Sequence, residues 1–283
     1  MNTDEQAQSG PQPGPQPPLQ VAESAPPYGV PAGAPRAGTS KGTSKYCDIN
    51  LARLQQLGMV THDGGRTTVA EDFRIIKRPL LRNARAGACE IKHGNLIVIT
   101  SALPGEGKTY CAVNLAMSIA MEMDITVLLV DADVARPSVL KVLGLGAEPG
   151  LMDILLNDQM ELSDVILRTN VATLSILPAG RSNKHANELL ASRSMSALLS
   201  EIASRYADRV VIFDSPPLLI TSEASVLAAQ MGQVVMVVEA ETTTQRSVKE
   251  ALRLIEGCAH VNMIYNKTRN FPGGGDDYYG YYD

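Results

Sequence analysis

Aromatic residues are scarce in this sequence. Tryptophan is absent, and aromatic residues make up 4% of the 283 positions. Cysteines are also few, and they form neither a C-x-x-C pair nor a metal-ligand spacing: Cys47, Cys89, Cys111 and Cys258. This pattern predicts isolated thiols in a reducing compartment and argues against a disulfide framework or a cysteine-bound zinc site.

Basic charge is in short supply as well. Lys and Arg number 25 against 30 Asp and Glu, so the net charge is −5 and the pI is near 5.5. Binding to nucleic acid depends on a concentrated basic surface. The charge balance therefore argues against nucleic acid as the main partner.

Long apolar runs are missing too. No stretch reaches the roughly 18 apolar residues that a membrane-spanning helix needs. The first residues carry acids at Asp4 and Glu5 and then a Pro/Gln run, unlike the basic and apolar regions of a secretory signal. We expect a cytoplasmic protein, which a membrane partner can still hold at the membrane.

The first 44 residues differ in composition from the rest. Nine of the seventeen prolines fall there, among Gly, Gln, Ala and Ser. Such a segment buries too little apolar surface to offset its ordering entropy. We expect a disordered, partly polyproline-like tail over 1–44.

Residues 45–94 are expected to form a short helical segment. Apolar side chains lie near one face of a helix over 48–58, with Gly58 as its C-cap. After a polar turn, a second helix is expected over 69–78, ending near Pro79.

From residue 95 to 270, short runs rich in Val and Ile alternate with longer amphipathic stretches such as Ser247–Glu256. This alternation predicts an α/β fold with a doubly wound, mainly parallel sheet and helices on both faces. The expected strands are Leu96–Thr100, Thr126–Val130, Leu174–Leu177, Val210–Phe213, Val234–Val238 and Val261–Ile264.

The last segment, 271–283, changes character again. A flexible linker, Phe271–Gly275, precedes a cluster of tyrosines flanked by aspartates. Four tyrosines lie in the last six residues, and they are candidate phosphate acceptors: Tyr278, Tyr279, Tyr281 and Tyr282.

A phosphate-binding loop follows the first expected strand of the domain. Residues 102–109 match G-x-x-x-x-G-K-[ST], except that Ala102 replaces the first glycine. Backbone N–H groups of such a loop close around phosphate oxygens at the positive end of a helix. Lys108 is expected to reach the β/γ-phosphates of ATP and Thr109 to bind Mg²⁺. The expected nucleotide contacts are Pro104, Gly105, Glu106, Gly107, Lys108, Thr109 and Tyr110.

Carboxylates follow two of the other expected strands. Asp131 and Asp133 come after the second strand, and Asp214 follows the fourth. Open parallel sheets bind ligands at the carboxyl ends of their strands. Carboxylates placed there can hold Mg²⁺ or accept a proton from a nucleophile. A helix cap or a turn is the alternative role for a single strand-end Asp.

These motifs together resemble those of bacterial tyrosine kinases. The P-G-E-G-K-T loop, the D-A-D of residues 131–133 and the D-S-P-P of residues 214–217 carry the resemblance, which covers about 46–283. Members of that family phosphorylate their own tyrosine-rich tails and regulate capsule or exopolysaccharide export. The amino-acid sequence of residues 71–81 and 131–137 looks most like that of exosortase-associated tyrosine autokinases. The resemblance implies a P-loop fold related to the partition and cell-division ATPases.

By this resemblance, the acids belong to two family motifs. Asp131 and Asp133 match an extra Walker motif, D-x-D-x-R, and Asp214 matches the Walker B acid. The arginine position of the first motif is Ala135 here, with Arg136 one place later, so the role of that arginine stays open.

The family also carries an E-x-x-R-x-x-R helix that joins subunits into a ring. Glu71 and Arg74 match it, and Lys77 stands where the last arginine would be. The spacing of three places these residues on one helical face. Lysine lacks the planar fork of arginine, so Arg78 is a candidate replacement. A solvated charged face is the alternative.

The chemistry implied is transfer of the ATP γ-phosphate to a tyrosine, in trans within an oligomer. Partition-type relatives carry a second lysine where this chain has Leu103, which favours a kinase over a dimeric ATPase switch. Lys108 and Mg²⁺ would offset phosphate charge. Asn266, after the last strand, is expected near the adenine.

The metal and base roles fall to the three acids. We expect Thr109, Asp133 and Asp214 to hold the metal, directly or through water, and Asp131 to accept the tyrosine proton. Asp131 and Asp133 could exchange these roles.

Two other functions stay open. One is a P-loop ATPase that regulates an export or partition complex without kinase activity. The other is an interaction module whose nucleotide only stabilises docking to a membrane protein. The resemblance implies that the chain binds further copies of itself and the cytoplasmic end of a separate polysaccharide chain-length regulator. It also implies other polysaccharide enzymes as substrates. Peripheral association with the inner membrane would follow from such a regulator.

Overall fold

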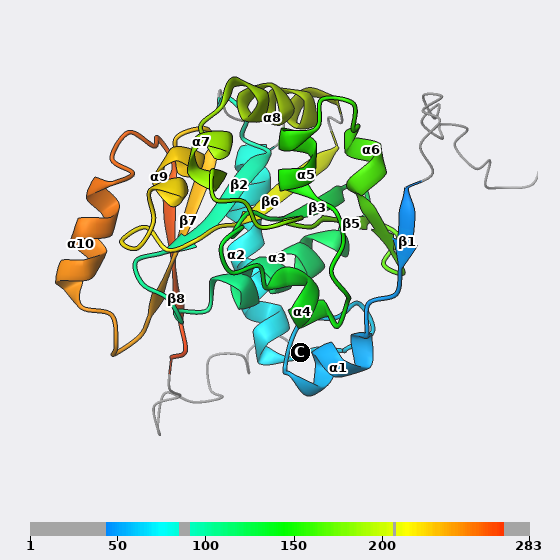
Figure 1. Cartoon of the computed structure of the whole chain (residues 1–283). Coiled ribbons are helices and arrows are strands. Elements are labelled where there is room, and N and C mark those ends of the chain that lie inside the picture. The colour runs from blue at the N-terminus through cyan, green and yellow to red at the C-terminus, as the bar shows by residue number, and fades with distance from the viewer. Residues whose placement is uncertain (1–43, 85–90, 206–207, 269–283) are drawn as a thin grey trace, which may run out of the picture. The chain divides into compact units, whose positions relative to one another are not determined.

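A computed structural model describes residues 44–84, 91–205 and 208–268 of the chain. Figure 1 shows these residues as ribbons. The Pro-rich tail expected over 1–44 lies outside the described residues except for Ser44, and so does the whole segment 271–283 with its four candidate tyrosines. Cys89 lies outside them as well.

The core element is one eight-stranded sheet with the strand order β1-β4-β5-β3-β6-β2-β7-β8. All neighbouring strands are parallel except β4 and β5, which are antiparallel. The predicted α/β fold with a mainly parallel, doubly wound sheet is therefore confirmed. The strands are β1 Lys45–Cys47, β2 Leu96–Ser101, β3 Thr126–Asp131, β4 Leu167–Thr169, β5 Leu174–Leu177, β6 Arg209–Asp214, β7 Gln233–Glu239 and β8 Val261–Asn266.

The six strands expected from the sequence all exist, each within a few residues of its expected bounds. Two strands were not expected, β1 and β4, and both have three residues. Such short strands contain too few positions for an alternation of polar and apolar residues to be recognised. They pair in parallel with each other at the edge of the sheet.

Helices cover both faces of the sheet (Figure 1). Helices α1–α4 pack on one face and α5–α10 on the other. Successive residues of a central strand alternate between the two cores: Val235 and Val237 of β7 belong to the first, and Val234 and Met236 to the second. The helices are α1 Leu51–Gln56, α2 Thr68–Ala84, α3 Lys108–Ala120, α4 Val139–Leu143, α5 Leu151–Leu156, α6 Leu162–Val165, α7 Ala186–Leu190, α8 Arg193–Arg205, α9 Ser222–Ala228 and α10 Gln245–Arg253.

The C-terminal end of helix α2 differs from the end expected from the sequence. We expected it to end near Pro79, but it continues through this proline to Ala84. A proline inside a helix removes one backbone hydrogen bond. Leu80 and Leu81, which follow it, are both buried in the core. Burial of these side chains offsets the lost bond, because tertiary packing supplies most of the stability of a helix in a protein.

Two other helices differ from expectation only at their ends. Helix α1 is shorter than the expected 48–58, because the Asn50 side chain accepts a hydrogen bond from Arg53 N and caps the helix there. Helix α10 begins at Gln245, two residues before the expected start, because Thr244 accepts from Ser247 N in the same way.

Candidate functional site

The phosphate-binding loop lies where the sequence predicts it, between the end of β2 and the start of α3. Gly105 and Gly107 have φ angles of 87° and 96°, in the left-handed region that favours glycine. Ala102, which departs from the motif, is fully buried in the core, so its methyl group is accommodated. Lys108 opens α3, is 9% exposed, and makes no hydrogen bond or ion pair with another described residue.

Gly107 has a steric requirement in addition to its backbone angle. A Cβ atom at this position would lie 2.1 Å from Nδ2 of Asn266, at the end of β8. A Cβ atom at Gly105 would meet nothing within 4 Å. The close approach of Asn266 therefore explains why the second glycine in particular cannot carry a side chain.

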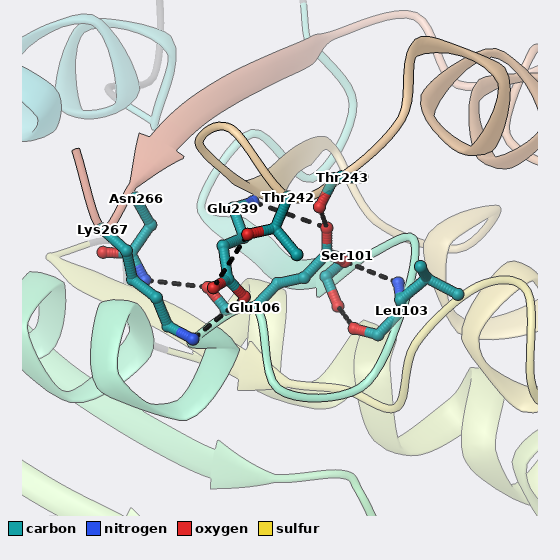
Figure 2. A network of polar contacts seen from close by, with 8 residues as sticks. All are labelled: Ser101, Leu103, Glu106, Glu239, Thr242, Thr243, Asn266 and Lys267. Atoms are coloured by element: carbon teal, nitrogen blue, oxygen red, sulfur yellow. Dashed lines mark hydrogen bonds and ion pairs between the residues drawn. The ribbon is translucent and has the colours of Figure 1, made fainter. Parts of the chain in front are cut away.

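Glu106 is the buried member of the loop, only 2% exposed (Figure 2). Its Oε2 accepts a hydrogen bond from Leu103 N at 2.5 Å. Its Oε1 accepts from the Thr243 hydroxyl and, at 3.5 Å, from Glu239 N. The Glu106 carbonyl oxygen accepts from Asn266 Nδ2 at 2.8 Å. The loop is thus joined to the carboxyl ends of β7 and β8.

Figure 2 shows the rest of this network. The Ser101 hydroxyl donates to the Leu103 carbonyl oxygen at 2.7 Å. The Lys267 ammonium forms an ion pair with Glu239 at 2.9 Å, and the Thr242 hydroxyl donates to the same carboxylate at 3.4 Å. We call these eight residues the Glu106 network: Ser101, Leu103, Glu106, Glu239, Thr242, Thr243, Asn266 and Lys267.

Little in the sequence indicates this network. We expected Glu106 and Asn266 to be separate contacts of the nucleotide, and the structure shows that they bond to each other across 160 positions of sequence. The one available signal was a glutamate within a loop that otherwise suits anions.

The Thr109 hydroxyl lies beside the strand-end acids. It donates to Asp214 Oδ2 at 2.6 Å and shares a hydrogen bond of 2.7 Å with the Ser138 hydroxyl. Asp131 stands opposite Asp214 in the register of β3 and β6. Asp131 Oδ2 accepts from the backbone N–H groups of Ser138 and Val139, at 2.9 and 3.0 Å. The structure therefore brings Thr109, Asp131 and Asp214 together.

Both central acids retain a buried oxygen without a partner. Oδ1 of Asp131 and Oδ1 of Asp214 accept no hydrogen bond from any residue that the structure describes. The pKa of Asp214 is raised to about 8, chiefly by burial; the Thr109 hydroxyl and Lys108 lower the pKa, and the Asp131 charge adds to the rise. Burial likewise raises the pKa of Asp131 to about 6, against the two backbone donors. The pair formed by Asp131 and Asp214 can therefore bind either a proton or a cation.

Asp133 is the more open acid. It is half-buried, and its Oδ1 accepts from Arg136 N at 3.0 Å. Burial raises its pKa, and the charges of Lys108 and Arg136 lower it. Ala135 and Arg136 are both exposed, so the arginine shifted by one place touches the site through its backbone.

The residues present fit a divalent cation held jointly with a nucleotide. Within the described ranges, no cluster of three or more His, Cys, Asp or Glu side chains could hold a metal ion alone. Mg²⁺ commonly takes one or two carboxylates and completes its shell with phosphate oxygens and water. Two unpartnered buried carboxylate oxygens beside the Thr109 hydroxyl match that pattern.

The expected nucleotide contacts Pro104 and Tyr110 lie in different surroundings. Pro104 is exposed at the tip of the loop. The Tyr110 side chain is turned away from the loop, and its hydroxyl donates to the Gly58 carbonyl oxygen at 3.3 Å. Its ring packs against the core formed with α1–α4. Only the backbone of Tyr110 is left to meet a phosphate.

The expected oligomerisation residues on α2 do not share one environment. Glu71 and Arg74 form an ion pair with each other and are both about one third exposed. Lys77 is 6% exposed; its ammonium donates to the Ser118 carbonyl oxygen at 2.6 Å and pairs with Glu122 at 2.6 Å. The expectation that Lys77 faces another subunit does not fit this burial, because its charge is satisfied within the chain. Arg78 is exposed on the same helix.

The family profile described as an AAA domain matches residues 94–267. Tyrosine-protein kinase YwqD of Bacillus subtilis is 33% identical over 162 residues, which cover 57% of this chain and 67% of YwqD. The succinoglycan biosynthesis transport protein ExoP of Rhizobium meliloti is 31% identical over 222 residues, covering 76% of this chain and 27% of ExoP.

A solved structure agrees with the fold. The crystal structure of the chimerical protein CapA2B2 matches with a TM-score of 0.62 and 28% identity, covering 75% of this chain and 97% of that one. The chain spans about a quarter of the length of the first curated relatives that it matches. Among the described residues, no helix has the length and apolar character needed to cross a bilayer.

Proposed function

The chain belongs to the bacterial tyrosine-protein kinase family, and from this premise we propose that it is an ATP-dependent protein-tyrosine autokinase. The acceptors would be the tail tyrosines Tyr278, Tyr279, Tyr281 and Tyr282. The observation that supports this most is the Thr109–Asp214 hydrogen bond beside a phosphate loop that carries Leu103 in place of a second lysine. That arrangement can hold a nucleotide triphosphate and its cation without a lysine from a partner.

Positioning and charge neutralisation would supply most of the catalysis. Backbone N–H groups of the loop and the Lys108 ammonium would bind the β- and γ-phosphates. Mg²⁺, when bound, would neutralise phosphate charge. The tyrosine oxygen would form its bond to the γ-phosphorus as the bond to the β–γ bridging oxygen breaks, with the tyrosine proton passing to an aspartate.

The geometry favours the exchange of roles that the sequence left open. Asp131 has one oxygen bonded to two backbone N–H groups and the other buried beside Asp214, so a tyrosine hydroxyl has little access to it. We therefore assign Asp131, with Thr109 and Asp214, to the cation. The half-buried Asp133 is the better proton acceptor, because its carboxylate is partly exposed and the Lys108 charge favours its ionised form.

Asn266 can still serve the adenine. Its Nδ2 is bonded to the Glu106 carbonyl oxygen. Its Oδ1 remains for the adenine amino group, which is a hydrogen-bond donor.

The setting we propose is exopolysaccharide synthesis or export, which the similarity to the succinoglycan biosynthesis transport protein ExoP supports. Glu71 and Arg74, partly exposed on α2, would contact a neighbouring copy, with Arg78 in place of Lys77. The expected partner is the cytoplasmic end of a membrane chain-length regulator, which would hold the chain at the inner membrane. Other polysaccharide enzymes would be further substrates. The assignment to the exosortase-associated group stays a prediction.

The decisive experiment is incubation with γ-labelled ATP and Mg²⁺. Wild type should become labelled on tyrosine, while Lys108→Met and a truncation before Tyr278 should not. Lys141→Met, a change at an exposed lysine of α4, is the matched control and should label normally. Mixing the Lys108→Met chain with the truncated chain tests transfer in trans. The Lys108→Met chain has the tail but no working phosphate site, and the truncated chain has the site but no tail.

Failure of this proposal has a clear form. A wild-type chain that stays unlabelled in the presence of its membrane activator contradicts the kinase. Release of free phosphate without labelled protein would instead identify a P-loop ATPase, which the same Thr109–Asp214 pair would support.

A further inference from the structure

Glu106 poses a physical problem in a loop that binds phosphate. A carboxylate close to the phosphate site repels the anion, and the repulsion is stronger where water is excluded. Glu106 is nonetheless buried in the loop at 2% exposure. Burial of a charged group is costly unless hydrogen bonds satisfy it. Its contacts therefore indicate what the residue does.

The partners of the Glu106 carboxylate are all donors and come from two directions. Leu103 N belongs to the phosphate loop itself. The Thr243 hydroxyl and Glu239 N belong to the end of β7 and the turn that leads into α10. The carboxylate thus joins Leu103 of the loop to the turn after β7 (Figure 2).

The backbone of the same residue is held from a third element. Asn266, at the end of β8, donates to the Glu106 carbonyl oxygen at 2.8 Å. Both the side chain and the main chain of Glu106 are therefore fixed by residues at least 133 positions later in the sequence.

We propose that Glu106 is a positioning residue, which acts through the Thr243 hydroxyl to hold the phosphate loop in its binding conformation before the nucleotide arrives. This inference rests on the proposed nucleotide-binding function. It assigns Thr243, which no motif marks, as the principal partner of Glu106. Neither residue needs to touch the nucleotide.

The physical basis is preorganisation. A loop with two glycines loses more backbone entropy on ordering than an ordinary loop. Bonds that order it in the free protein remove that cost from the binding step. The carboxylate satisfies the N–H group of Leu103 within the loop, which leaves the N–H groups of Gly105, Gly107 and Lys108 for phosphate oxygens.

The test compares three single variants in the turn after β7. Thr243→Val removes the hydroxyl and keeps the shape, whereas Thr243→Ser keeps the hydroxyl. Thr242→Val is the matched control, because Thr242 bonds to Glu239 and not to Glu106. The dissociation constant for ATP with Mg²⁺ is measured by calorimetry, alongside the unfolding temperature of each nucleotide-free variant.

We expect Thr243→Val to bind ATP about tenfold more weakly, the effect of losing one hydrogen bond to a charged group. Thr243→Ser and Thr242→Val should bind within about twofold of wild type, and all unfolding temperatures should stay within about 4 °C. A merely structural role for Thr243 would lower the unfolding temperature without this split in affinity. Inorganic triphosphate with Mg²⁺ should follow ATP, because the effect lies in the phosphate loop.

A second pair keeps the test decisive if Thr243→Val unfolds. Glu106→Gln can still accept from Leu103 N and donate to the Thr243 hydroxyl, so it should bind within about threefold of wild type. Glu106→Ala should bind about tenfold more weakly or worse. Equal affinity of Thr243→Val and Thr242→Val, or of Glu106→Ala and Glu106→Gln, overturns the inference alone. Wild type that binds no ATP overturns the proposed function as well.

Discussion

Asp131 and Asp214 lie opposite each other on the neighbouring strands β3 and β6, and each retains one buried carboxylate oxygen without a hydrogen-bond partner among the described residues. Two carboxylates this close repel each other when both are ionised. The nucleotide-free protein therefore favours at least one proton on the pair. A bound cation would supply a partner for these two carboxylate oxygens.

The first prediction concerns stability and pH. The pKa of Asp214 is raised from 3.8 to about 8, so between these values the folded chain keeps a proton that the unfolded chain has released. The contribution of Asp214 to the free energy of unfolding therefore falls as pH rises through this window. Asp214→Asn, which cannot ionise, should unfold at a higher temperature than wild type at pH 8 without nucleotide. A gain of about 1 kcal/mol corresponds to about 2–4 °C.

Asp131→Asn is the matched control for that measurement. The pKa of Asp131 is about 6, so its own loss of stability should be complete near pH 6 rather than pH 8. Thermal unfolding at pH 5, 6.5 and 8 separates the two. An Asp214→Asn chain with the same pH slope as wild type would contradict the assignment.

The second prediction concerns the cation. A carboxylate must lose its proton before it binds Mg²⁺, so metal binding should release protons. We expect the affinity for Mg²⁺ with ATP to rise from pH 6 to about pH 8, through the raised pKa of Asp214. Calorimetry in two buffers of different ionisation enthalpy measures the release directly. Removing Mg²⁺ with a chelator should abolish it, and no release below pH 7 would argue against Asp214 as a ligand.

The third prediction separates the two basic residues of α2. Lys77→Met leaves Glu122 and the Ser118 carbonyl oxygen without their partner, so it should destabilise the fold by about 1–3 kcal/mol. Arg78→Met, a change at an exposed residue of the same helix, should leave the unfolding temperature nearly unchanged and weaken self-association. Thermal unfolding and sedimentation measure the two effects. If Lys77→Met instead dissociates an oligomer at full stability, Lys77 is an interface residue after all.

The fourth prediction compares the two glycines of the phosphate loop. Alanine at either position meets the cost of a left-handed backbone, about 1 kcal/mol or more. Gly107→Ala must in addition displace Asn266, whose Nδ2 would lie 2.1 Å from the new Cβ. We expect Gly107→Ala to lose ATP binding at least about tenfold more than Gly105→Ala, by equilibrium titration. Equal losses would show that the Asn266 contact contributes nothing.

Local signals made much of the fold predictable. The strands β2, β3, β6 and β7 are buried apolar runs long enough to recognise, and the loop between β2 and α3 carries a motif with its own steric logic. Parallel strands end at one edge of a sheet, so the meeting of Thr109, Asp131 and Asp214 followed from the sequence as well.

The unpredicted features depend on contacts between distant segments. Lys77 looks like an interface residue by its spacing, but the Ser118 carbonyl oxygen, 41 positions away, turns it inward. Pro79 looks like a helix end, but burial of Leu80 outweighs the missing hydrogen bond. Glu106 looks like one more residue of a phosphate motif, and nothing near it in sequence announces Thr243, 137 positions later.

The bond from Asn266 to Glu106 also has a consequence for the order in which the chain is made. Synthesis proceeds from the N-terminus, and domains fold as their segments emerge from the ribosome. Glu106 is added 160 residues before Asn266. A nascent or prematurely ended chain would therefore carry an intact motif in a loop that still lacks its final support. A growing chain would therefore acquire its full ability to bind nucleotide only after Asn266 has been added.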